Sequence, residues 1–84
     1  MNVGEARNQI LDVLVGVEIL TDAQRQGLVE DLARDLQLAE LGIDSMKIVD
    51  LCVGLEERVG REISIEELIE HPTVNALAGH FAAV

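Results

Sequence analysis

An 84-residue chain with 49% apolar residues can form one small core, but it is too short to enclose an active-site cavity as well. Its 16 acidic and 6 basic residues give a formal charge of −10, which disfavours nucleic acid and anionic membranes as partners because both would repel it. A single cysteine excludes an internal disulfide and no Cys/His spacing resembles a zinc site, so we expect one metal-free domain over residues 1–84.

The first helix is predicted over residues 3–16. Asn2 followed by Glu5 is typical of a capped helix start, in which a side chain satisfies a backbone N–H of the first turn. Apolar residues then recur at helical spacing and predict one buried face: Val3, Ala6, Ile10, Val13, Leu14 and Val17.

The segment 17–40 has a weaker pattern than its neighbours. Thr21 with Gln24 forms a second capping pair, so we expect a helical stretch within 22–34 that is broken near Gly27. The rest is predicted to be a long connection packed over the core. Four leucines should pin this connection down: Leu28, Leu32, Leu36 and Leu38.

A strongly patterned helix is predicted to begin at Ser45 and to run to about Val59, with Gly60 ending it because glycine readily adopts a left-handed backbone. An advance of about 100° per residue gathers five apolar residues into one core-facing stripe: Ile48, Leu51, Cys52, Leu55 and Val59. The opposite face carries two apolar residues among carboxylates, with a glycine and a lysine beside them: Met46, Val53, Asp50, Glu57, Gly54 and Lys47. This mixture favours a docking surface, although single exposed apolar residues are common on proteins.

Two shorter helices are predicted in the C-terminal part. Ile63 should point into the core from an extended link, and Ser64 with Glu67 forms a capping box. The helix that follows should end by His71, since the residue before a proline is pushed out of the helical region, and its apolar side is Ile65, Leu68 and Ile69. Thr73 should cap the last helix, whose core residues are Val74, Leu77, Ala78 and Phe81.

Residues 42–46 (Gly-Ile-Asp-Ser-Met), with Asp-Leu at 50–51 and Leu-Glu-Glu at 55–57, resemble the attachment site and second helix of acyl carrier proteins. Residues 71–74 (His-Pro-Thr-Val) with Leu-Ala at 77–78 resemble carrier domains of modular polyketide and nonribosomal peptide assembly lines more than fatty acid carriers. The resemblance implies an all-α fold. The expected form is a small four-helix bundle of three main helices and a short third helix, with a long loop between the first two.

The resemblance also implies a chemistry for Ser45. Its hydroxyl would carry 4′-phosphopantetheine, transferred from coenzyme A by a separate phosphopantetheinyl transferase with Mg²⁺. A phosphate suits this position, because the free N–H groups and the dipole at a helix N-terminus favour an anion. Acyl or aminoacyl groups would ride on the arm's thiol from an acyltransferase or adenylating loading enzyme to a ketosynthase or condensing enzyme.

A recognition surface around Ser45 follows from the same resemblance: Asp44, Met46, Lys47, Asp50, Val53, Glu56 and Glu57. Lys47 and Arg58 are basic residues on an otherwise acidic helix, and fatty acid carriers often have an acidic or polar residue in place of Lys47. We expect them to select a dedicated partner, because charge juxtaposition sets specificity. Lys47→Glu should then change the choice of partner without unfolding the domain.

Other interpretations of Ser45 stay open. A lone serine before a helix is usually an N-cap, and the chain would then be an acidic helical interaction module without a prosthetic group. A carrier of amino acids or aryl acids that serves an adenylating enzyme would have the same fold. An enzyme is disfavoured, because Ser45 with His71 or His80 lacks a recognisable nucleophile turn. We expect His71 at a helix end and His80 at the surface.

The sequence also suggests a cellular setting. It shows no basic segment followed by an apolar run at its start, and no apolar stretch long enough to span a membrane. We therefore expect a soluble, cytoplasmic monomer whose partners come and go, because Phe81 is its only aromatic residue and tight interfaces favour aromatic anchors. The positions of Met1 and of the C-terminus, just outside the outer helices, favour a freestanding protein over an excised domain.

Overall fold

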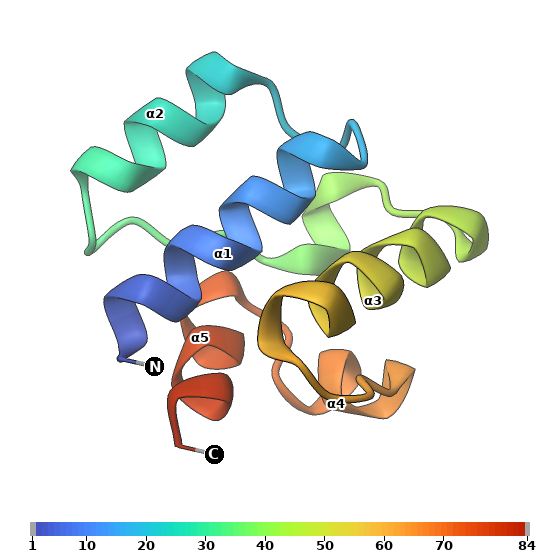
Figure 1. The fold of residues 1–84 in the computed structure, drawn as a ribbon. Coiled ribbons are helices and arrows are strands. Elements are labelled where there is room, and N and C mark those ends of the chain that lie inside the picture. Colours follow the sequence, from blue (N-terminus) through green and yellow to red (C-terminus); the bar gives the residue numbers. More distant parts are fainter. Residues whose placement is uncertain (1, 84) are drawn as a thin grey trace.

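The regular elements of the computed structural model, which describes residues 2–83, are all helical (Figure 1). In chain order they are α1 (Val3–Gly16), α2 (Asp22–Glu30), a 3₁₀ turn (Leu38–Leu41), α3 (Ser45–Val59), α4 (Ile65–Glu70) and α5 (Val74–Ala82). Before each α-helix stands a side chain that accepts a backbone N–H of the first turn, namely Asn2, Thr21, Asp44, Ser64 and Thr73. The predicted all-α bundle is confirmed, and its long connection contains a helix of its own.

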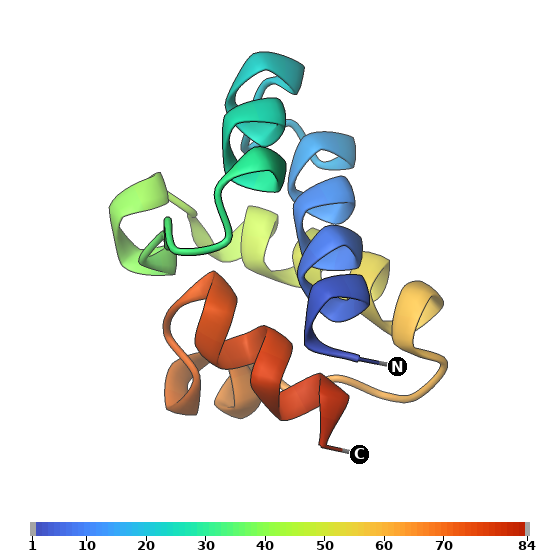
Figure 2. The same ribbon diagram turned by 90° about the vertical axis from the view of Figure 1, so that its left-hand side faces the viewer.

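The core forms where α1 meets the other helices (Figures 1 and 2). Ile10 and Leu14 of α1 are buried together with Leu51 and Leu55 of α3 and with Leu77 of α5. The core stripe predicted for α3 and the inward position of Ile63 are both confirmed. Within residues 2–83, no helix has the length and apolar character needed to cross a membrane.

The connection between α1 and α3 differs from its prediction in two places. α2 continues through Gly27 without a break. A glycine weakens a helix by about 1 kcal/mol relative to alanine, and the capping box of Thr21 and the burial of Leu28 outweigh this loss. Leu28 and Leu38 are buried as expected, but Leu32 lies in a turn after the end of α2 and is 65% exposed. The helical spacing that predicted its burial no longer applies there.

A buried guanidinium, absent from the sequence prediction, joins the connection to the rest of the bundle. Arg7 of α1 is only 2% exposed. It donates to the carbonyl oxygens of Leu28, Asp31 (3.2 Å) and Arg34 (2.6 Å), and to Oδ1 of Asn75 in α5 (2.8 Å). A hydrogen bond to a charged group stabilises more than a neutral one, so this one side chain ties three parts of the fold together.

A short stretch of extended chain makes a second tie. The N–H of Leu38 donates to the carbonyl of Pro72 at 2.8 Å, and the N–H of Val74 donates to the carbonyl of Leu36 at 3.0 Å. These bonds form an isolated antiparallel bridge between Gln37 and Thr73. The bridge places the 3₁₀ turn beside the loop between α4 and α5.

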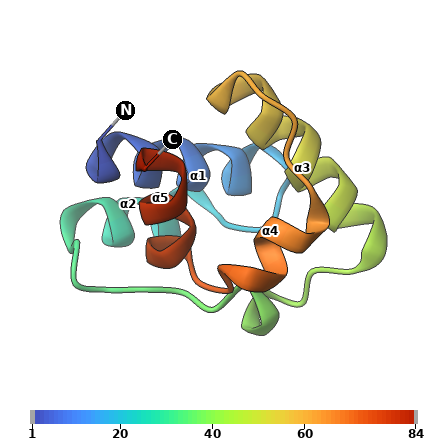
Figure 3. The ribbon, with the colours of Figure 1, turned by 90° about the horizontal axis from the view of Figure 1, so that it is seen from below.

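α4 lies between α5 and α3 (Figure 3) and is less buried than predicted. Leu68 points into the core, but Ile65 and Ile69 are 44% and 69% exposed. The prediction failed because a helix of six residues makes fewer than two turns and buries only one position.

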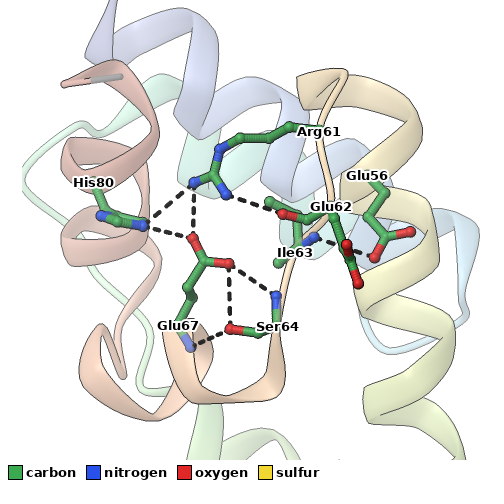
Figure 4. A network of polar contacts seen from close by, with 7 residues as sticks. All are labelled: Glu56, Arg61, Glu62, Ile63, Ser64, Glu67 and His80. Atoms are coloured by element: carbon green, nitrogen blue, oxygen red, sulfur yellow. Dashed lines mark hydrogen bonds and ion pairs between the residues drawn. The ribbon is translucent and has the colours of Figure 1, made fainter.

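The prediction of His80 as a surface residue is also wrong. Its Nε2 lies 2.8 Å from Oε1 of Glu67, which also accepts from Nη2 of Arg61 at 2.8 Å (Figure 4). Oε2 of Glu67 accepts from the N–H of Ser64 at 2.8 Å, so a single carboxylate joins the start of α4 to the preceding link and to α5. His71, at the end of α4 as expected, stacks on His80 with ring centroids 4.1 Å apart.

The Glu67 cluster predicts a dependence of stability on pH. Hydrogen bonds from Arg61, His80 and the Ser64 N–H lower the pKa of Glu67 from 4.5 to about 2. Because the folded pKa is lowered, the stabilisation is present above about pH 4.5 and is lost as the pH falls toward about 2. The difference in free energy of unfolding between wild type and Glu67→Gln should therefore be largest above pH 5 and shrink below it. Urea unfolding at a series of pH values measures this, with Glu66→Gln on the exposed side of α4 as control; a difference independent of pH would contradict it.

Candidate functional site

The segment before α3 delivers Ser45 to the first position of that helix. The 3₁₀ turn ends at Gly42, whose φ of 65° lies in the left-handed region that favours glycine. Asp44 then has an extended backbone and caps α3, its carboxylate accepting the N–H of Lys47 at 2.8 Å. The interpretation of Ser45 as the N-cap is wrong, because its neighbour Asp44 has that role.

The side chain of Ser45 is thereby left available. The residue is exposed, and across residues 2–83 no hydrogen bond uses its hydroxyl. The N–H of Ile48 is satisfied by the carbonyl of Asp44 at 3.0 Å, and that of Lys47 by the Asp44 side chain. In the described part of the chain, the N–H groups of Ser45 and Met46 have no protein acceptor, so the end of the helix presents two free donors beside an exposed hydroxyl.

An exposed apolar face extends from Ser45 along α3. Met46 is 78% exposed and Val53 is 49% exposed, as predicted. Val49, which the sequence analysis assigned to neither face, is 52% exposed and belongs with them. Its position on the helical wheel, between the core stripe and the outer face, was the signal that could have placed it. We call these three residues the apolar face of α3; Asp50 and Glu57 flank it as exposed carboxylates.

Two residues predicted on the recognition surface make bonds within the domain instead of pointing freely outward. The Lys47 ammonium donates to the carbonyl of Val17 at 2.6 Å and is half-buried. One oxygen of the half-buried Glu56 accepts the N–H of Ile63 at 3.1 Å (Figure 4). Gly54 faces α1, where an added Cβ would lie 2.6 Å from Cγ1 of Val13. The side of α3 next to α1 is therefore closed.

Internal partners also engage most of the basic residues. Arg58 donates to Gln9 and pairs with Asp12 at 3.5 Å, so this departure from an acidic helix is bound within the domain. Arg25 pairs with the same aspartate and Arg61 with Glu67. Among the described residues, no salt bridge neutralises five exposed carboxylates of α3, α4 and the link between them: Asp50, Glu57, Glu62, Glu66 and Glu70. The surface beside Ser45 is thus strongly negative.

An apolar pocket of about 300 Å³ opens between the 3₁₀ turn, α3 and α4. Ile43 and Ile48, on either side of Ser45 in the chain, both line it, and the other lining residues are Leu38, Ala39, Leu51, Leu68, Ile69 and Pro72. The two histidines lie elsewhere, stacked beside Glu67, and no hydrogen bond joins either of them to Ser45 within residues 2–83. The geometry therefore provides no base to activate the hydroxyl.

The thiol of Cys52 is buried in the core, as predicted. Burial, followed by the nearby charges of Glu56 and Glu67, raises the pKa of this thiol. A protonated, inaccessible thiol is a poor nucleophile. Cys52 is therefore not a candidate for catalysis.

The sequence matches the protein family described as "Phosphopantetheine attachment site" over residues 23–81, which includes Ser45 and the whole of α3. The chain belongs to this family. Members of the phosphopantetheine-binding family carry 4′-phosphopantetheine as a covalent group, and the predicted resemblance is confirmed.

Curated relatives of this phosphopantetheine-binding chain include large polyketide synthases. A phenolphthiocerol/phthiocerol polyketide synthase of Mycobacterium tuberculosis is 44% identical over 54 residues, which are 64% of this chain and 3% of that protein. Polyketide synthase GfsA of Streptomyces halstedii is 32% identical over 78 residues, 93% of this chain and 1% of that protein. Non-reducing polyketide synthase hmp3 of Hypomyces subiculosus is 33% identical over 55 residues, 64% of this chain and 3% of that protein.

The chain therefore spans only a few per cent of the length of these relatives. No solved structure matches it. The relatives confirm the polyketide type of carrier predicted from residues 71–78.

The start of α3 fits the phosphopantetheine group of the family. An exposed hydroxyl that bonds to no other group can be reached by a separate transferase. The two free N–H groups of Ser45 and Met46, at the positive end of the helix dipole, favour the phosphate that would be attached there. No other exposed serine competes, because Ser64, the second serine of the chain, accepts the N–H of Glu67 as a helix cap.

The bond made by Lys47 changes what we expect of its substitution in this phosphopantetheine-binding chain. Lys47→Met keeps the apolar stem but removes the donor to Val17, and should lower the free energy of unfolding by about 1 kcal/mol. Lys47→Glu should lower it further, because a carboxylate would face a carbonyl oxygen, while the domain stays folded. Urea unfolding of both variants measures this. Stabilities equal to the wild type would show that the Lys47 bond contributes nothing and would leave partner choice as its sole role.

Proposed function

We propose that this chain is an acyl carrier of polyketide biosynthesis with phosphopantetheine attached to Ser45. The observation that carries the proposal is the position of Ser45, whose exposed hydroxyl opens α3 without serving as its cap. When attached, the arm supplies a terminal thiol that holds acyl groups as thioesters. The chain itself supplies the position of the arm and the surface that partners recognise, and it does not catalyse the transfers.

The residues around Ser45 would divide this work. Asp44 fixes the start of α3 and so the direction in which the hydroxyl faces. The free N–H groups of Ser45 and Met46 would stabilise the phosphodiester. The apolar pocket bordered by Ile43 and Ile48 offers an aliphatic cargo a place out of water.

Partners would dock on the apolar face of α3 and its acidic surroundings. Exposed apolar side chains ringed by carboxylates suit a partner surface with apolar contacts inside a basic rim. Phe81 is buried, so this surface offers no aromatic anchor, and partners should exchange readily. We infer that the partners are a phosphopantetheinyl transferase, an acyltransferase and a ketosynthase. Asp44, Glu56 and Lys47 would shape this surface from its edges.

The test is the intact mass of the chain after incubation with coenzyme A, Mg²⁺ and a broad-specificity phosphopantetheinyl transferase. We expect one phosphopantetheine to be added. The modified protein should also gain one thiol that reacts quickly with maleimide, whereas Cys52 of the unmodified protein should react slowly because it is buried. No addition to the folded chain, with a control carrier modified in the same tube, would refute the proposal and favour an acidic interaction module.

A further inference from the structure

α4 contributes little to the core. It has six residues, and Leu68 is its only buried side chain. Isolated helices shorter than about 12 residues are marginal in water, so α4 depends on contacts with its surroundings. Because Ile65 and Ile69 are exposed, those contacts are mainly polar and lie near its two ends.

One side chain of α5 meets both ends of α4. In the first turn, Oε1 of Glu67 lies 2.8 Å from Nε2 of His80 (Figure 4). At the other end, the ring of His71 stacks on the same imidazole, with centroids 4.1 Å apart and planes 17° apart. Arg61 holds Glu67 from the link that precedes α4. His80 therefore acts as a clamp across the whole length of this short helix.

Two features of the molecule lie behind α4. Leu68, Ile69 and Pro72 form one side of the apolar pocket. Cys52 lies one helical turn before Glu56, on the face of α3 from which Glu56 bonds Ile63 in the link to α4. The charge of Glu67 acts on the Cys52 thiol, which places that thiol close to α4. Displacement of α4 would expose both the pocket and the thiol.

We propose that α4 opens as a unit while α1, α3 and α5 stay packed, and that the contacts of His80 with Glu67 and His71 set how often it opens. Short elements with few buried contacts open at lower free energy than the global unfolding of a domain. A group too large for the closed pocket would bind only the open form, so the clamp would set the energetic cost of admitting it. The proposal concerns the unmodified chain and does not rest on the attachment of a prosthetic group.

Cys52 provides the probe, since it is the only cysteine of the chain. Its reaction with 5,5′-dithiobis(2-nitrobenzoate) in the unmodified protein reports opening around α4. His80→Ala should speed this reaction roughly tenfold, the change expected from loss of one hydrogen bond to a charged group. His71→Ala, which removes only the stacked ring, should speed it by a smaller factor. Amide hydrogen exchange of residues 65–70 should quicken in both variants while that of α1 does not.

Arg25→Ala is the matched control. Arg25 pairs with Asp12 between α1 and α2, away from α4, so its loss weakens the domain without touching the clamp. The three variants are compared with their global stabilities from urea unfolding. The proposal holds if the two histidine variants react faster than their loss of global stability accounts for and Arg25→Ala does not. It is overturned if all three rates follow global stability alone, or if neither histidine variant changes the rate; should His80→Ala fail to fold, His71→Ala decides by the same criteria.

Discussion

Replacing Ser45 by alanine is expected to abolish phosphopantetheine attachment and to leave the free energy of unfolding within about 0.5 kcal/mol of the wild type. Attachment should be lost because no other exposed hydroxyl stands at the start of α3. Stability should be retained because the Ser45 side chain makes no hydrogen bond in the described part of the chain. Intact mass after the transferase reaction and urea unfolding measure the two quantities.

Asp44→Ala is the matched variant, one residue away, and its expected result is the reverse. Loss of the cap on the Lys47 N–H should lower the free energy of unfolding by about 1 kcal/mol, yet the protein should still be modified at Ser45. The two variants thus separate attachment from capping. Attachment to Ser45→Ala, or a loss of about 1 kcal/mol in that variant, would return Ser45 to the role of a structural cap.

The helix boundaries were predictable because they depend on local chemistry. The capping residues Thr21 and Ser64 each bond an N–H three residues ahead, as their sequence spacing predicted. Gly60 adopts a left-handed backbone just beyond α3, with φ of 84°. Each of these interactions closes within a few residues, so the sequence contains both partners side by side.

Interactions between distant residues were not predictable in the same way. Arg7 bonds carbonyl oxygens 21 to 27 residues away, and backbone carbonyls leave no trace in a sequence pattern. His80 was assigned to the surface because nothing near it in sequence announces Glu67, 13 residues earlier. Lys47 and Glu56 looked like free surface charges for the same reason, although their partners are backbone groups.

The candidate site was more predictable than the surface around it. The residues before α3 form a contiguous motif, and the family match over residues 23–81 agrees with the resemblance that this motif suggested. The helical wheel separated the core stripe of α3 from its exposed face correctly. It did not show which neighbours cover the edges of that face, since this depends on how α1 and the link to α4 pack against α3.

Replacing Arg7 by methionine is expected to lower the free energy of unfolding by about 3 kcal/mol, because several buried acceptors lose their donor at once. The carbonyls of Leu28, Asp31 and Arg34 and the amide of Asn75 all depend on this one guanidinium. Small domains are stable by only about 5–15 kcal/mol, so a large share of the stability would be lost. Urea unfolding followed by circular dichroism measures the change, and the loss should be greatest for the attachment of residues 28–34 to α1.

Arg25→Met applies the same substitution to an arginine of a different kind. The Arg25 side chain is 30% exposed and its partner Asp12 is 33% exposed, so water can replace the ion pair. Such a pair contributes at most about 1 kcal/mol, and Arg25→Met should stay within that limit. If both variants lost the same small amount, the guanidinium of Arg7 would be a replaceable space-filler. If only Arg7→Met loses several times more, the connection between α1 and α3 is held to the core by a single buried cation, and the leucines around it act as its apolar shield.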